Sequence, residues 1–457
     1  MTVPVKKNEV KEIEIINLNH KGQGVGKIDS FTVFVNGGLI GDKIEVKIIL
    51  VKKNYAVGKM IKLIEPSKNR IQPKCSVADI CGGCQLQGLS YEVQLDIKTD
   101  KVKNDIERIG KLDGVQIHNT IGMKTPYNYR NKAQFPVGMS ADGVKIGFYE
   151  RGTHDIVDIK SCVIQHDLND KVLDIVRTYM NENNIKPYNE KTRKGIIRHV
   201  LTKTAFATED IMVVIITNGK ELPYREKLID SLTSELSNIK SIVQNINTSR
   251  NNRILGKKSK TLHGEDKIVD YIGELKFKIS AESFFQVNPM QTEVLYNKAL
   301  EYANLTGNET VFDLYCGIGS ISLFLAKKAK KVYGVEIVDQ AIKDARENAK
   351  INSITNAEFH TGKAEEVFPK LYSQGVNADV VVVDPPRKGC DQEVLDTIVN
   401  MQPDRVVYVS CNPSTLARDL KYLDEKGYKT VEVQPVDMFP HTMHVEAVTL
   451  LTRKNEL

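Results

Sequence analysis

The chain has 457 residues, which is too long for a single hydrophobic core and predicts two or three domains. Hydrophobic residues make up 41%, and no apolar run approaches the length of a membrane-spanning helix, about 18 residues, which excludes an integral membrane protein. The first ten residues, MTVPVKKNEV, lack the apolar core of a signal peptide, so we expect a cytoplasmic protein. We also expect the protein to act as a monomer.

Residues 1 to 66 predict a small β-barrel. Short alternating strands are separated by glycine-rich turns at residues 22 to 26 and 37 to 41. The spacing in GQGVGKIDSFTVFVNGGLIGDKIEVKI resembles the TRAM domain, an OB-like RNA-binding module. Residues 1 to 70 contain 13 Lys and Arg against 7 Asp and Glu, so the whole net charge of +6 lies here. This excess favours RNA binding, although a solvated lysine-rich surface would give the same composition.

The cysteines indicate metal binding or catalysis. There are seven, an odd number, in a chain without a recognisable signal peptide, which argues against a disulfide framework. Cys75, Cys81 and Cys84 lie within ten residues on a glycine-containing loop, and Cys162 is the only other cysteine before Cys316. A close triplet with one distant cysteine is typical of a [4Fe-4S] cluster. Structural zinc, which usually takes two Cys-x-x-Cys pairs, is the alternative.

Residues 67 to 278 mix strand-like and helical runs and predict a central α+β domain that carries the cluster ligands. Within it, residues 91 to 124 are expected to pack with the catalytic domain. Aromatic rings and guanidinium planes stack on bases in RNA sites. Five side chains in this region are candidates for such stacking: Tyr127, Tyr129, Arg130, Arg198 and His199. The alternative for each is an ordinary exposed side chain.

Residues 279 to 457 predict a Rossmann-like domain. VFDLYCGIGSISLFLA combines a buried strand, a glycine turn and a helix, and KVYGVEI gives a second strand with Glu336 at its end. An acid there can bind the two hydroxyls of a ribose, while glycines let the backbone approach the ligand. A nicotinamide site would have a third glycine where Ser322 stands, so the pattern favours S-adenosylmethionine.

Two further apolar runs, VVVV at 380 to 383 and VVYV at 406 to 409, predict buried strands of a parallel sheet. Ligands of such sheets bind at the carboxyl ends of the strands, which places Asp384 and Cys411 in one crevice. Taken alone, a cysteine is most often a buried core residue. A thiol, with a pKa of about 8.5, needs an activating environment before it can act as a nucleophile.

Covalent catalysis by Cys411 suits a pyrimidine substrate. Carbon 5 of uracil is a poor nucleophile until a thiolate adds to carbon 6. A base must then remove the carbon-5 proton, and MFPHTMHVEAVTLL offers Glu446, with His441 and His444 as alternatives. Methyltransferases that act on exocyclic amines resemble one another in having an aromatic residue after the two prolines, whereas Arg387 stands there in this chain.

The motifs AESFFQVNP, DLYCGIGS, DPPRKG, SCNPSTLARD and HTMHVE together resemble the RNA uracil-C5 methyltransferases that contain a TRAM domain and an iron-sulfur cluster. The resemblance covers nearly the whole chain and implies an α/β multidomain protein with domains at 1–66, 67–278 and 279–457. It implies Cys411 as nucleophile and Glu446 as base. It further implies S-adenosylmethionine contacts from Gln286, Tyr315, Glu336 and Asp384, and [4Fe-4S] ligands Cys75, Cys81, Cys84 and Cys162.

One position departs from related cofactor sites. Lys363 stands where an Asp or Asn often accepts a hydrogen bond from the adenine amine, and lysine has no acceptor. A backbone carbonyl is the expected substitute.

The combination of a TRAM domain with a cluster resembles the branch of this family that forms 5-methyluridine in 23S ribosomal RNA, which is the expected partner. A transfer-RNA enzyme is the alternative. An RNA-binding redox sensor with an inactive methyltransferase fold is disfavoured by the intact Cys411 and Glu446. A small-molecule methyltransferase is disfavoured by the basic barrel.

Overall fold

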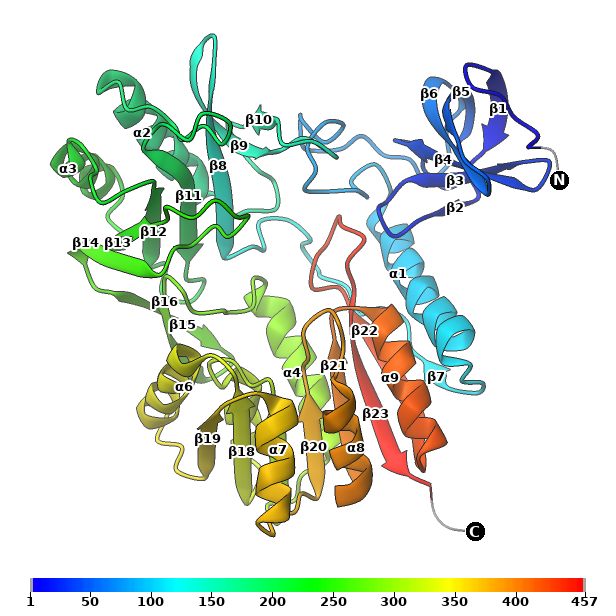
Figure 1. Ribbon diagram of the computed structural model, residues 1–457, viewed down its shortest axis with the longest axis vertical. Helices are drawn as coiled ribbons and strands as arrows, with labels where there is room; N and C mark the ends of the chain where they lie inside the picture. Colours follow the sequence, from blue (N-terminus) through cyan, green and yellow to red (C-terminus); the bar gives the residue numbers. More distant parts are fainter. Residues whose placement is uncertain (1–2, 455–457) are drawn as a thin grey trace. The chain divides into compact units, whose positions relative to one another are not determined.

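The computed structural model describes residues 3 to 454 (Figure 1). The chain forms two compact units. The smaller comprises the described residues up to Ile97 together with Phe148–Val157 and Phe439–Met443, and the larger comprises Lys98–Gly147, Asp158–Met438 and the described residues from His444 onward. The domain boundaries at residues 66 and 278 stay predictions.

Six strands near the amino terminus form one sheet in the order β1-β5-β6-β4-β3-β2. Their bounds are β1 Val10–Glu14, β2 Asn17–Leu18, β3 Gly24–Ile28, β4 Phe31–Asn36, β5 Lys43–Val51 and β6 Tyr55–Glu65. Alternate side chains of these strands form a buried core that includes Ile13, Val33, Val35, Ile44 and Val46. The alternating strands predicted from the sequence are confirmed.

Glycines allow the two ends of this sheet to meet. The backbone N–H of Ile16, just after β1, donates to the carbonyl of Val25 on β3 at 2.9 Å. A side chain at Gly26 would meet the Glu14 carbonyl at 2.9 Å. The sheet therefore closes into a barrel because this position has no Cβ.

A seven-stranded sheet follows in the order β10-β9-β8-β11-β12-β13-β14. Its strands are β8 Lys132–Ser140, β9 Gly143–Tyr149, β10 Ile156–Asp158, β11 Ile197–Thr204, β12 Ile211–Thr217, β13 Ile239–Ile246 and β14 Lys258–Gly264, with helices α2 Leu168–Glu182 and α3 Arg225–Glu235 between them. Strands β12 and β13, which α3 connects, are parallel. A hairpin of β15 Lys267–Ile272 and β16 Leu275–Ser280 comes next. The mixture is the α+β arrangement predicted for this region.

The carboxyl-terminal part contains an eight-stranded sheet in the order β19-β18-β17-β20-β21-β23-β22-β7. Its strands are β17 Thr310–Leu314, β18 Lys331–Glu336, β19 Ala357–Thr361, β20 Val380–Val383, β21 Arg405–Ser410, β22 Tyr428–Val436, β23 Glu446–Arg453 and, from earlier in the chain, β7 Gln116–Ile117. Strands β17 to β21 are mutually parallel, whereas β23 runs antiparallel to both of its neighbours. The strands predicted from VVVV and VVYV are confirmed as β20 and β21.

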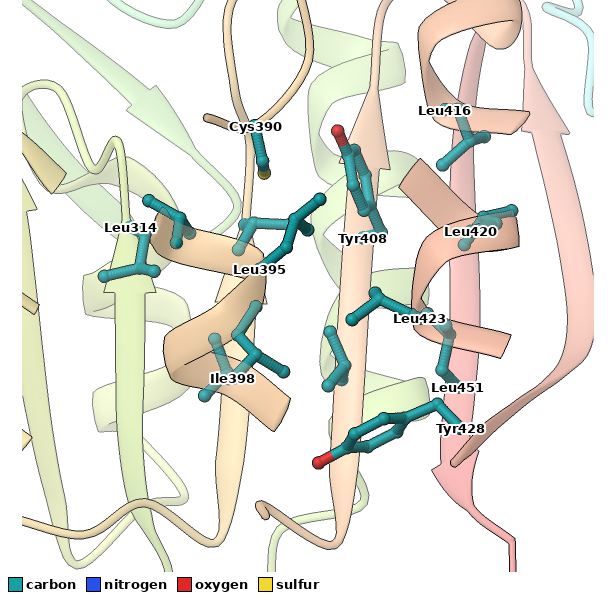
Figure 2. Close-up of a cluster of buried hydrophobic side chains, with 14 of the residues drawn as sticks. Leu314, Cys390, Leu395, Ile398, Tyr408, Leu416, Leu420, Leu423, Tyr428 and Leu451 are labelled. Atoms are coloured by element: carbon teal, nitrogen blue, oxygen red, sulfur yellow. The ribbon is translucent and has the colours of Figure 1, made fainter. Parts of the chain in front are cut away.

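Helices pack against this sheet. They are α4 Pro289–Ala303, α5 Ser320–Ala326, α6 Asp339–Ile351, α7 Ala364–Ser373, α8 Gln392–Met401 and α9 Pro413–Glu425. The π-helical turn η1 Ile106–Gly110, which continues α1 Tyr91–Asp105, packs against α9. Figure 2 shows Leu395 of α8 and Leu416 of α9 on either side of Tyr408 from β21. Each buried leucine contributes about 1.5–3 kcal/mol, so this layer holds the strands that carry the site. In the described part of the chain, no helix has the length and apolar character needed to cross a bilayer.

Candidate active site

Polar side chains follow neighbouring strands at the carboxyl edge of the parallel sheet. The last residue pairs that β17 makes with β18 and with β20 are in register. The residues that come next, Tyr315, Glu336 and Asp384, therefore occupy adjacent positions at this edge. The structure brings these three predicted contacts together where parallel sheets bind their ligands.

Cys411 and Glu446 come to the same edge from two antiparallel strands. Ser410 of β21 pairs with Ala447 of β23, so Cys411 and Glu446 are the next facing residues in this register. Facing residues of antiparallel strands have Cα atoms about 5 Å apart. Cys411 is partly exposed, whereas Glu446 is 4% exposed.

The glycine turn after β17 leaves backbone groups available to a ligand. Tyr315, Gly317 and Gly319 all have positive φ angles, of 71°, 56° and 81°. The Glu336 carboxylate accepts from the backbone N–H of Gly317 at 3.2 Å and of Val338 at 2.9 Å, which fixes the acid beside the turn. A side chain at Gly317 would meet nothing within 4 Å, so open space lies in front of the turn.

The segment directly after the Glu336 acid exposes apolar side chains. Ile337 and Val338, directly after Glu336, are 59% and 53% exposed. Lys363 is also exposed, and its ammonium pairs with Glu366 at 2.9 Å. The Lys363 ammonium is thus paired with a carboxylate of the protein.

Gln286 lies on the loop before α4 and is 8% exposed. The side chain of Asn131 donates to the Gln286 carbonyl at 2.9 Å, and its backbone N–H donates to the Val287 carbonyl at 2.8 Å. Asn288 caps α4 by accepting from the backbone N–H of Gln291 at 3.2 Å. These bonds fix the loop on both sides of Gln286.

Burial is the main influence on the nucleophile candidate. It raises the pKa of the Cys411 thiol to about 11, with further contributions from Glu446 and Asp384 and an opposing one from Arg387. Cys411 directly precedes Asn412, which caps α9, and a helix amino terminus favours a thiolate. Burial thus favours the neutral thiol, whereas Arg387 and the amino terminus of α9 favour the thiolate.

The two acids at this edge also have raised pKa values. Burial raises the pKa of Glu446 to about 7. Burial and then the neighbouring Glu446 raise the pKa of Asp384 well above its usual range. A carboxyl with a pKa near 7 can take up and release protons at physiological pH, as a general base must.

The two histidines that closely precede Glu446 in the sequence belong to different units. His441 is 1% exposed, and its backbone N–H donates to the side chain of Gln94 at 3.0 Å. The His441 carbonyl accepts from the backbone N–H groups of Gln85 and Leu86, so this residue helps to hold the smaller unit together. His444 is exposed and belongs to the larger unit with Cys411.

The four predicted cluster ligands are divided between the units. Cys75, Cys81 and Cys84 belong to the smaller unit and Cys162 to the larger. The backbone N–H of Gly83 donates to Cys81 Sγ at 3.4 Å, a contact that suits a thiolate ligand. Among residues 3 to 454, no group of three or more His, Cys, Asp or Glu side chains is arranged to hold a metal ion. The donor chemistry fits a soft metal centre, but the structure does not show an assembled one.

Two residues predicted to stack on RNA have structural roles instead. Tyr129 is fully buried. Arg198 is 7% exposed, lies over the ring of Tyr188 at 4.2 Å and donates to the carbonyls of Asn247 and Ser249. The stacking prediction is wrong for both, because short-range sequence patterns do not report burial. Tyr127, Arg130 and His199 are partly exposed, and for them it stays a prediction.

Asp313 is a buried acid that the sequence analysis missed. It is fully buried on β17, one Oδ atom accepts from the Ser322 hydroxyl at 2.5 Å, and the other has no hydrogen-bond partner. Burial raises its pKa to about 7. The sequence feature that indicates a buried acid here is the aspartate inside an otherwise apolar strand, VFDL, directly before the glycine turn.

The sheet order, the glycine turn and the acid at the end of β18 define the fold of the S-adenosylmethionine-dependent methyltransferases. The tRNA (uracil-5-)-methyltransferase family model matches residues 90–454, and the TRAM domain model matches residues 4–61. The chain belongs to this family, so it is an RNA methyltransferase with an amino-terminal TRAM domain, as the motifs predicted.

Relatives agree with this assignment over their whole length. A protein of Clostridium tetani is 52% identical over 450 residues, covering 98% of both chains, and one of Bacillus cereus strain ATCC 10987 is 54% identical over 453 residues, covering 99% of this chain and 98% of the relative. Each is named an uncharacterized RNA methyltransferase. The structure of Pyrococcus abyssi tRNA (uracil-54, C5)-methyltransferase in complex with S-adenosyl-L-homocysteine is similar, with a TM-score of 0.77 and 28% identity over 97% of this chain and 100% of that one.

Proposed function

We propose that the protein transfers a methyl group from S-adenosylmethionine to carbon 5 of uridine in 23S ribosomal RNA. The observation that carries the proposal is the facing register of Cys411 and Glu446 at the sheet edge shared with Glu336 and Asp384. Addition to carbon 6 and proton removal from carbon 5 require a nucleophile and a base at one place.

In this mechanism Cys411 Sγ adds as a thiolate to carbon 6 of the uracil, which gives carbon 5 the electron pair that takes up the methyl group. S-adenosylmethionine supplies that methyl group when bound. Glu446 then removes the carbon-5 proton, the double bond between carbons 5 and 6 re-forms, and Sγ leaves with its electron pair. The cycle ends with a Cys411 thiolate and a protonated Glu446.

The electrostatics support this division of roles. Burial raises the pKa of Cys411 to about 11, so the thiol must release its proton to solvent before Sγ adds to carbon 6, and Arg387 and the amino terminus of α9 favour the resulting thiolate. Burial raises the pKa of Glu446 to about 7, so this carboxyl can exchange a proton near neutral pH.

For the methyl donor, we propose contacts from Gln286, Tyr315, Glu336 and Asp384. The position of Glu336 at the end of β18 supports this, because an acid at the end of the second strand of such sheets can bind the ribose hydroxyls. Exposed Ile337 offers an apolar surface to adenine, and a backbone carbonyl in place of Lys363 would accept from its amine.

We propose that Cys75, Cys81, Cys84 and Cys162 bind a [4Fe-4S] cluster with a structural role. The spacing of the cysteines and the N–H donor to Cys81 support this. Cys411 and Glu446 carry out their steps without electron transfer, so no step of the methylation needs the cluster.

The ribosomal target rests on the TRAM domain together with the cysteine set. Transfer RNA is the second candidate, favoured by the full-length similarity to the Pyrococcus abyssi transfer-RNA enzyme. We further propose that the protein works as a monomer in the cytoplasm and that its domains divide near residues 66 and 278.

The experiment is to incubate the protein with labelled S-adenosylmethionine and, in separate reactions, unmodified 23S ribosomal RNA and unmodified transfer RNA. Digestion and mass spectrometry then locate the product. We expect 5-methyluridine in the ribosomal RNA. Label only in transfer RNA would move the proposal to the second candidate, and methylation at another base atom would contradict the mechanism.

A further inference from the structure

Lys203 is a buried lysine on β11, far along the chain from the motifs of the methyltransferase site. It is 4% exposed, and its Nζ donates to the carbonyl of Ser280 at 2.6 Å and to that of Ser283 at 2.8 Å. Burial lowers the pKa of Lys203 well below its usual value. An amine is costly to bury, and these two carbonyls compensate it.

The turn that Lys203 holds begins the loop that carries Gln286. Within the turn, the hydroxyls of Ser280 and Ser283 lie 2.8 Å apart, and the backbone N–H of Ser280 donates to the Ser283 hydroxyl at 3.1 Å. The Ser283 hydroxyl in turn donates to the Asp344 carboxylate at 2.9 Å. Asp344 lies on α6, the helix after the acidic end of β18, so the turn joins the loop to that helix.

The same helix holds the glycine turn. Asn348, one helical turn after Asp344, donates to the Ile318 carbonyl at 3.2 Å and accepts from the backbone N–H of Lys278 at 3.0 Å. Asp344 and Asn348 are 1% and 0% exposed. The loop, the glycine turn and α6 are therefore joined by buried polar side chains, and Lys203 anchors one end of this network.

Stability alone does not account for a lysine here. Lys132 of β8 is paired directly opposite Lys203, so both side chains project from the same face of the sheet into a small cavity that they line with Asp270 and Phe285. Two ammonium groups in facing positions repel each other, and after burial Lys132 is the next cause of the lowered pKa of Lys203. An apolar side chain of similar length would avoid this repulsion and the desolvation cost. The specific contribution of the amine is its pair of bonds to the turn.

We infer that Lys203 is a positioning residue for the methyl donor: by holding the turn from Ser280 to Ser283, it fixes Gln286 relative to α6 and Glu336. This inference rests on the proposed function, because it takes Gln286 and Glu336 as donor contacts.

The test measures the Kd of S-adenosylhomocysteine by calorimetry with the full-length protein. Lys203→Met keeps the length of the side chain and removes its donors, and Lys132→Met is the matched control from the facing position. We expect the Kd to rise about tenfold or more in Lys203→Met and to stay unchanged in Lys132→Met. The KM for S-adenosylmethionine should rise with little change in kcat, and the affinity for RNA should not change. A lower Tm with an unchanged Kd would show a merely structural role and overturn the inference.

Ser283→Ala provides a second variant, because it keeps both carbonyls that Lys203 binds and removes the Ser283 hydroxyl, with its bond to Asp344 and its two contacts with Ser280. Should Lys203→Met fail to fold, a wild-type Kd in Ser283→Ala would overturn the inference, and a raised Kd would support it. Glu336→Ala separates this inference from the proposed function. If Glu336→Ala loses binding while Lys203→Met and Ser283→Ala keep it, only the positioning role fails. If the wild-type protein does not bind the ligand, the proposed function fails first.

Discussion

Replacing Glu446 by glutamine should stabilise the unliganded protein at neutral and alkaline pH. Glu446 is 4% exposed, and burial raises its pKa from 4.5 to about 7. Between these values the folded protein holds a proton that the unfolded chain has released, so wild-type stability falls as the pH rises through this window and the loss is complete above about pH 7. Since one pKa unit corresponds to about 1.4 kcal/mol, the full loss is about 3 kcal/mol. Glutamine does not ionise, so the variant does not lose this stability as the pH rises.

The measurement is the free energy of unfolding of wild type and Glu446→Gln at pH 5 and pH 8. Relative to wild type, the variant should gain about 2.5 kcal/mol more at pH 8 than at pH 5. Glu393→Gln, at an exposed position on α8, is the control and should show no such difference. An advantage for Glu446→Gln that is equal at both pH values would refute the view that Glu446 is buried as a neutral acid.

The same substitution should stop catalysis after methyl transfer. Because glutamine cannot take up the carbon-5 proton, the RNA stays attached to Cys411, and release should slow by about 10²- to 10⁴-fold. The assay is the yield of a protein-RNA adduct that survives denaturation. A normal turnover rate would place the base elsewhere, and His444 would be the next residue to test.

Cys411→Ala should bind RNA and the methyl donor like wild type but incorporate no label, because only the covalent step needs sulfur; substantial methyl transfer would exclude the nucleophile role. Protein purified without oxygen should be brown and contain about four irons per chain, whereas one zinc and no iron would contradict the cluster. Deleting residues 1–66 should weaken RNA affinity and flatten its salt dependence, because fewer counterions are released. The deletion also exposes Leu86 and Leu89, because Leu18 and Leu39 pack on them. A second variant, with glutamine at the exposed Lys52, Lys53 and Lys59, removes charge and leaves this contact in place. An unchanged salt slope in both variants would mean that the lysines are only a solvated surface.

The strands of the methyltransferase sheet could be predicted because their patterns are local. A strand buried on both faces, such as Val380–Val383, reads as an unbroken apolar run, and the polar residue after it marks the ligand edge. In contrast to these strands, the facing register of Cys411 and Glu446 could not be predicted from the sequence. It depends on β23 lying between β21 and β22, and no local pattern specifies this order.

The side chains that hold the site were missed because their partners are distant in sequence. Lys203 bonds to carbonyls about 80 residues away, and Asn131 bonds to a carbonyl 155 residues away. Backbone carbonyls carry no signature in the sequence, so a lysine that binds two of them looks like a surface lysine. The same reasoning explains Arg198, whose guanidinium donates to two backbone carbonyls about 50 residues away.

Strand β7 also affects the order in which the newly made chain can fold. Gln116 and Ile117 pair with Glu432 and Val433, and the central seven-stranded sheet lies entirely between them in the sequence. At about 5–20 residues per second, a ribosome needs roughly 15 to 60 seconds to make the intervening segment. During that time the central sheet can form, whereas β7 must wait for its partner strand. The methyltransferase sheet therefore gains β7 as its edge strand only after β22 has been made, so this edge depends on a segment that is synthesised long after β7 itself.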